Sequence, residues 1–78
     1  MSIYWVTSNS TYTINGTNFN GHIVAESGTI LNLNCSNING DVWARGTLNL
    51  GTNTVRINGN LNLGSLPTVE WLMDKPVV

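Results

Sequence analysis

Charge is scarce in this sequence. Asp, Glu, Lys and Arg make up 9% of its 78 residues, against about 25% in an ordinary soluble domain. Three basic and four acidic side chains give a net charge of −1 at pH 7, which argues against a nucleic-acid or anionic-membrane surface that depends on positive charge. The surface must consist largely of Asn, Thr, Ser, Gly and exposed apolar groups, and such a surface tends to associate.

Cysteine and histidine are almost absent, with Cys35 and His22 as single examples. One cysteine cannot form an internal disulfide, and no second Cys or His offers it a zinc site. The opening residues MSIYWVTSNS contain no basic residue and only a short apolar run, so we expect neither a signal peptide nor a membrane span. We therefore expect a cytoplasmic protein, or a virion-associated one if the chain is viral, with no cofactor.

Helical periodicity is also missing, because no stretch keeps apolar residues at helical spacing over three turns. Apolar and polar residues alternate instead in the segments TYTI, TLNL, TVRI and NLNL, which is the period of β-strands. The length suits one small domain with a thin core. The sequence thus predicts a single all-β domain over residues 1–78.

An Asn-Gly phrase returns every 19 residues and places Asn20, Asn39 and Asn58 in one column. Short strands with such a period predict a single-stranded β-solenoid, in which coils stack about 4.8 Å apart. Stacked Asn side chains can hydrogen-bond along such a column. The positions that would face the core are apolar in all copies: Phe19, Ile38, Ile57, Ile23, Val42, Leu61, Ala25, Ala44 and Leu63.

The Asn-Gly pairs have an alternative interpretation as two-residue hairpin turns of an antiparallel β-sandwich or barrel. The pairs Asn15-Gly16 and Asn20-Gly21 lie too close together for both to turn a useful hairpin. A meander also gives no reason for residues on both sides of the turn to repeat. The solenoid is therefore the preferred prediction.

We assign the repeats to residues 19–65, with residues 1–18 as an N-terminal strand or cap segment and 66–78 as a C-terminal cap or interface segment. Further along each copy the spacing drifts, with residues 28–30 answering residues 46–48. We expect insertions at a corner of the coil to cause this drift.

Two sets of polar residues share the repeat spacing. Glu26 and Arg45 are 19 residues apart and are expected to lie on adjacent coils, within reach of an ion pair. His22, Asp41 and Asn60 form a second polar column.

A catalytic interpretation is weak. Cys35, His22 and Asp41 are the residue types of a thiol nucleophile, its base and an orienting acid. The strand pattern favours Cys35 as a small buried hydrophobe. Because no carboxylate pair, phosphate loop or metal cluster appears either, we expect no enzymatic activity.

Aromatic residues define an expected contact surface. Strand alternation turns Trp43 outward beside Val24, where it would contact another subunit or be covered by a terminal segment. Trp5 and Trp71 belong to the terminal segments, as cap or interface residues. The expected interface comprises Trp43, Val24, Trp5, Tyr4, Trp71 and Leu72.

The stretch GDVWARGTLNLGTNTVRINGNLNLG resembles the rungs of bactofilins, the polymer-forming bacterial cytoskeletal proteins with a right-handed β-helix core. The resemblance covers roughly residues 19–65. It implies a filament-forming protein and a weak peripheral membrane contact through Tyr4 and Trp5. The matching positions are Gly40, Val42, Ala44, Leu48, Leu50, Gly51, Gly59, Leu61, Leu63 and Gly64, with a weaker copy at Gly21, Ile23 and Ala25.

A solenoid this short leaves two open ends with unpaired backbone groups. We predict a non-enzymatic structural protein that self-assembles into a filament or closed oligomer and acts as a scaffold. The alternative is a small binding module of the phage type, which attaches to a host protein, a ligand or a virion component.

Overall fold

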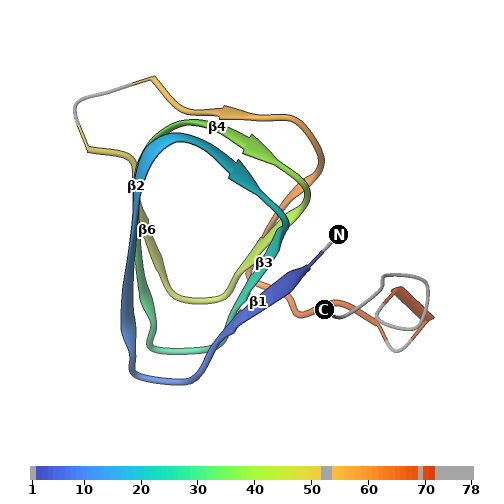
Figure 1. The fold of residues 1–78 in the computed structure, drawn as a ribbon. Helices are drawn as coiled ribbons and strands as arrows, with labels where there is room; N and C mark the ends of the chain where they lie inside the picture. The colour runs from blue at the N-terminus through green and yellow to red at the C-terminus, as the bar shows by residue number, and fades with distance from the viewer. Residues whose placement is uncertain (1, 52–53, 69, 72–78) are drawn as a thin grey trace.

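The chain winds around one axis as a stack of strands (Figure 1). The computed structural model describes residues 2–51, 54–68 and 70–71, and every strand pair in those residues is parallel. This confirms the all-β solenoid, and the antiparallel alternative is wrong. The strands are β1 (Ile3–Val6), β2 (Thr11–Asn20), β3 (His22–Ala25), β4 (Ile30–Asn39), β5 (Val42–Ala44), β6 (Thr47–Asn49), β7 (Arg56–Ile57) and β8 (Leu61–Leu63).

Each coil has a triangular outline (Figure 1). One sheet contains β1, β3, β5 and β8 in that order, and we call it face A. The long strands β2 and β4 bend, so β4 pairs with β6 along its first part and with β7 along its last part. We call the part of this sheet that contains β6 face B, and the part that contains β7 face C. The first, second and third coils span residues 3–20, 22–39 and 41–58, and β8 begins a fourth.

The repeat begins earlier than expected. Ile3 pairs with His22, and Tyr12 pairs with Leu31, so residues 3–20 are a complete coil and not a separate cap. The aliphatic pattern of the later coils is weak in the first coil because Tyr4 and Tyr12 occupy the inward positions that Ile23 and Leu31 occupy in the second.

The spacing changes between faces. On face A, Ile23, Val42 and Leu61 are successive register partners at the predicted 19 residues. On face B, Leu31 pairs with Leu48, a spacing of 17, where the sequence had suggested 18. The corner between faces A and B is two residues shorter in the third coil, and face C returns to the spacing of 19.

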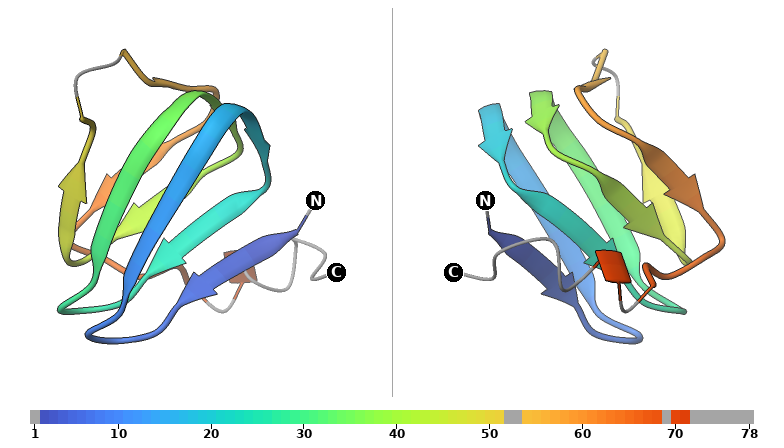
Figure 2. Two further views of the ribbon diagram at one scale, coloured as in Figure 1. Left: turned by 60° about the vertical axis from the view of Figure 1, so that its left-hand side comes forward. Right: turned by 90° about the vertical axis from the view of Figure 1, so that its right-hand side faces the viewer.

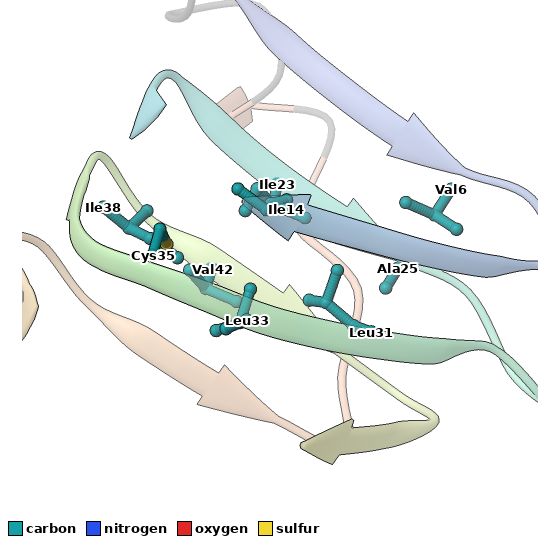
Figure 3. Packing of buried hydrophobic residues seen from close by; sticks show 9 residues of the cluster. All are labelled: Val6, Ile14, Ile23, Ala25, Leu31, Leu33, Cys35, Ile38 and Val42. Carbon is teal, nitrogen blue, oxygen red and sulfur yellow. The ribbon is translucent and has the colours of Figure 1, made fainter. Parts of the chain in front are cut away.

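The core lies inside the triangle and is built from the inward residues of all three faces (Figure 3). Five of the nine predicted core residues are buried: Ile23, Ala25, Ile38, Val42 and Ala44. Each buried Ile or Val side chain contributes about 1.5–3 kcal/mol relative to its exposed form.

The other four predicted core residues lie toward the ends of the stack. Phe19 and Ile57 are partly buried and pack against the core. Leu61 and Leu63 are in register with Val42 and Ala44 but are exposed. Their column assignment is confirmed and their predicted burial is wrong, since no described coil covers them.

The Asn-Gly pairs that repeat at residues 20–21, 39–40 and 58–59 form a corner of the coil, between faces C and A. A Cβ on Gly40 would lie 2.0 Å from the carbonyl oxygen of Gly21, and one on Gly59 would lie 2.3 Å from that of Gly40. Successive coils therefore approach so closely at this corner that a side chain has no room. This contact explains why glycine returns at the repeat spacing.

Candidate functional site

The C-terminal end of the solenoid exposes its core. Strand β8 pairs only with β5, and β6 pairs only with β4, so each has one unpaired edge in the described structure. Leu61 is 44% exposed, Leu50 45% and Leu63 64%. Neither β6 nor β8 contains a charged residue, whereas β7, the edge strand of face C at this end, contains Arg56. Charged side chains are a common way of keeping an edge strand from pairing with another chain, and β6 and β8 lack them.

The N-terminal end is also open but has a different lining. Strands β1 and β2 pair only with β3 and β4, and they too contain no charged residue. The Tyr4 and Phe19 rings meet edge to face, with centroids 4.7 Å apart. A hollow of about 310 Å³ lies beside the Tyr4 ring. Its lining combines aromatic rings with hydroxyl groups: Tyr4, Trp5, Val6, Thr7, Ser10, Thr11 and Tyr12.

Asparagine ladders connect the coils along the outside of the stack. Asn58 donates from Nδ2 to Oδ1 of Asn39, and Asn39 donates to Asn20, both at 2.8 Å. The predicted column is therefore confirmed as a hydrogen-bonded ladder. Exposed pairs of this kind contribute modestly, about 0.5–1.5 kcal/mol per bond at most.

Further ladders were not anticipated from the sequence. Their signal was present, because Asn15 and Asn34, and likewise Asn18 and Asn37, are separated by the repeat spacing. These pairs bond at 3.4 and 3.1 Å. On face B, Asn49 donates to Asn32 at 2.9 Å, and Asn32 donates to the Thr13 hydroxyl at 3.2 Å. This ladder is hard to find in the sequence because its two steps span 17 and 19 residues and its first member is a Thr.

All of these side-chain bonds have the same direction. In each one the later coil donates an amide N–H and the earlier coil supplies the accepting oxygen. The stack therefore has chemically different ends. Among the described residues, amide donors without an acceptor remain at the N-terminal end, and amide oxygens without a donor remain at the C-terminal end.

Residues 70–71, which follow the last strand, lie against the outer surface of face A (Figure 2). The Trp71 ring lies edge to face against Trp43, with centroids 5.6 Å apart, and against His22 at 5.2 Å. Its Nε1 donates to Oδ2 of Asp41 at 3.3 Å. Trp43 is thus covered by a terminal segment, the second of the two expected arrangements.

Fewer residues of the expected interface are exposed than the sequence predicts. Val24 is completely buried, so its prediction as an exposed contact is wrong: it lies between its register partners Trp5 and Trp43 on the outer surface. Tyr4 and Trp5 are exposed as expected. Leu72 lies outside the described residues.

Glu26 connects the first two coils but not through the expected ion pair. Its carboxylate accepts hydrogen bonds from Trp5 Nε1 and from the Ser8 hydroxyl, the latter at 2.8 Å. These bonds, with that of Trp5 the stronger influence, lower the pKa of Glu26 below its ordinary value. The predicted pairing with Arg45 is wrong: the carboxylate bonds to the first coil, and no ion pair joins it to Arg45 in the described residues.

His22 and Asp41 are neighbours, as the polar column predicted. The backbone N–H of Asp41 donates to His22 Nδ1 at 2.9 Å, and Asp41 Oδ1 accepts from the backbone N–H of Asn60 at 2.8 Å. An accepting Nδ1 carries no proton, so the 3.9 Å approach of Asp41 Oδ2 to that nitrogen is not an ion pair in this state.

Cys35 does not join His22 and Asp41. It lies inside the coil among core side chains (Figure 3), while the other two residues lie on the outside against Trp71. Burial raises the pKa of the Cys35 thiol, which disfavours the reactive thiolate. The structure therefore does not assemble the three residues into a nucleophilic site.

No group of three or more His, Cys, Asp or Glu side chains suited to a metal ion occurs in the described part of the chain. Within the same residues, no helix is long and apolar enough to cross a membrane. Comparison of the chain with protein-family models, with curated proteins and with solved structures returned no match. The arguments for function therefore depend on the two ends of the stack.

Proposed function

We propose that this protein is a non-enzymatic structural protein that self-assembles through the open ends of its solenoid and acts as a scaffold. The observation that supports this most strongly is the C-terminal end, where the uncharged edges of β6 and β8 adjoin the exposed side chains of Leu50, Leu61 and Leu63. Exposed apolar groups beside unpaired strand edges favour contact with another strand. The resemblance to bactofilins agrees with this proposal. We propose the cytoplasm, or a virion if the chain is viral, as the compartment.

A second copy is a suitable occupant because it carries matching chemistry. Its own N-terminal end has the uncharged edges of β1 and β2 and the partly apolar hollow lined by Tyr4 and Tyr12. A low net charge of −1 gives little long-range repulsion between copies. Association would extend the stacking that already forms the core.

The test is sedimentation velocity over a wide concentration range, combined with negative-stain electron microscopy. We expect the wild type to form larger species as its concentration rises. A double variant, Leu61→Lys with Leu63→Lys, should remain monomeric because it places charge on the exposed end. Ser36→Lys adds a charge at an exposed corner of the second coil and should assemble like the wild type. A wild type that stays a monodisperse monomer throughout would contradict the proposal.

The hollow at the N-terminal end supports a second candidate function, a small binding module of the phage type. Its volume of about 310 Å³ is at the lower limit of small-molecule sites, and its rings and hydroxyls suit a neutral ligand or a partner side chain. This candidate predicts a monomer that keeps its hollow accessible. The same sedimentation series therefore separates it from the scaffold.

A further inference from the structure

We propose that copies of this chain join head to tail, with the C-terminal end of one copy on the N-terminal end of the next, and that like ends do not join. This inference rests on the proposed self-assembly and specifies its geometry. A head-to-tail contact repeats without closing and produces a filament with a direction, or a ring if the rotation closes.

The first argument is the direction of the asparagine ladders. At the N-terminal end, Asn15, Asn18 and Asn20 use their Oδ1 atoms to accept from the second coil, and within the described residues their Nδ2 groups have no acceptor. At the C-terminal end, Asn49 and Asn58 use their Nδ2 groups to donate inward, and their Oδ1 atoms have no described donor. The N-terminal end thus presents amide donors and the C-terminal end presents amide oxygens, so the two ends are complementary in the kind of group they offer.

Contact between like ends lacks this match. Two N-terminal ends would oppose amide donors to amide donors, and two C-terminal ends would oppose oxygens to oxygens. Like ends would also be related by a two-fold axis across the stack, which makes the strands antiparallel at the joint. A head-to-tail joint keeps the parallel pairing found between all described coils.

The second argument is the shape and lining of the two ends. The C-terminal end projects aliphatic side chains, of which Leu63 is the most exposed. The N-terminal end is hollowed and lined by rings, including Tyr4 and Tyr12. Aliphatic side chains against a hollow that is partly aromatic bury apolar area on both partners, whereas two projecting ends would leave gaps between them.

The position of β8 decides how the next copy is turned. β8 occupies face A one coil beyond β6 and β7. A second copy stacked without rotation, so that its first coil continues faces B and C, would place its β1 where β8 already lies. Turning that copy by one face about the axis removes the overlap, because its β1 then lies on β6 and the coil path continues.

The experiment blocks one end at a time. Tyr4→Lys places a charge at the N-terminal end, Leu63→Lys places one at the C-terminal end, and Ser36→Lys is the control on the side of the stack. Circular dichroism first establishes that each variant is folded. Sedimentation velocity is then measured for each variant alone and for the equimolar mixture of the two end variants, at a concentration where the wild type assembles.

Head-to-tail joining predicts that each end variant alone is monomeric, with association weakened about 100-fold or more by the unpaired charge at the joint. The mixture should form dimers and nothing larger, since it offers one intact pair of ends. A dimer of either variant alone would overturn the inference and leave self-assembly standing. A mixture that stays monomeric would overturn it as well. A wild type that never assembles would overturn the proposed function itself.

Discussion

The third coil and the strand that follows it place equivalent residues in opposite surroundings. Val42 and Leu61 are register partners on face A, yet Val42 is fully buried and Leu61 is 44% exposed. Ala44 and Leu63 differ in the same way. The repeat decides which way a side chain points, and only a further coil buries it. In both pairs the larger side chain, Leu61 or Leu63, is the one that no described coil covers.

The largest expected effect comes from placing an Asp at Val42 and, in a separate variant, at its register partner Leu61. Val42→Asp places an uncompensated charge in the core and should destabilise the fold by about 4 kcal/mol or more, enough to abolish soluble folding of a small domain. Leu61→Asp should leave the monomer folded because its side chain reaches solvent. Soluble yield and thermal unfolding by circular dichroism measure both. Equal damage from the two substitutions would show that burial does not differ as described.

The next effect concerns the corner between faces C and A. Gly40→Ala inserts a Cβ 2.0 Å from the carbonyl oxygen of Gly21, so the coils must separate there. We expect a loss of about 3 kcal/mol in the free energy of unfolding, measured by urea denaturation. A Cβ on Gly64 would have no neighbouring atom within 4 Å, but the φ of this residue is +81°. Gly64→Ala should therefore lose only about 1–2 kcal/mol through backbone strain. The reverse order would contradict the close approach of coils at this corner.

A smaller effect compares the middle and the end of one asparagine ladder. Asn39→Ala removes two side-chain hydrogen bonds, and Asn58→Ala removes one. We expect losses of about 1 kcal/mol and about 0.5 kcal/mol respectively, since both side chains are partly or fully in solvent. Chemical denaturation of the two variants gives these values. Losses that do not depend on the number of bonds removed would mean that the ladder contributes little.

The smallest effect depends on pH and tests the link between the first and second coils. Because folding lowers the pKa of Glu26, its contribution is fully present above the unfolded value of about 4.3 and is lost as the pH falls through the folded value. Glu26→Gln should therefore lower the melting temperature slightly at pH 7, and the difference from wild type should shrink in acid. A difference independent of pH would contradict the role of the carboxylate.

The sequence predicted the solenoid because its evidence is repeated: the Asn-Gly corner and the aliphatic columns recur at a fixed spacing. It did not predict where the repeat starts, since Tyr4 and Tyr12 occupy inward positions at an open end, where bulky rings are tolerated. It also placed Val24 on the surface. Strand alternation gives the direction of that side chain, but its burial depends on the bulky Trp5 and Trp43 at its register positions in the neighbouring coils.

In the candidate site, too, only the contacts that follow the repeat could be predicted from the sequence. Columns within the repeat, such as that of His22, Asp41 and Asn60, were predictable. Contacts that break the period, such as those of Trp71 and Glu26, were not, because no spacing in the sequence encodes them. The exposed end at Leu63 was predictable only in general terms, as the open end that any short solenoid must have.

The central claim is that the open ends are completed by other copies of the chain. Residue-resolved amide hydrogen exchange, measured by NMR at low and high protein concentration, tests it most directly. We predict that the amides of β3 and of the first part of β4 are protected at both concentrations, and that those of β6 and β8 gain protection as the concentration rises. Unchanged, rapid exchange in β6 and β8 at every concentration would contradict the claim.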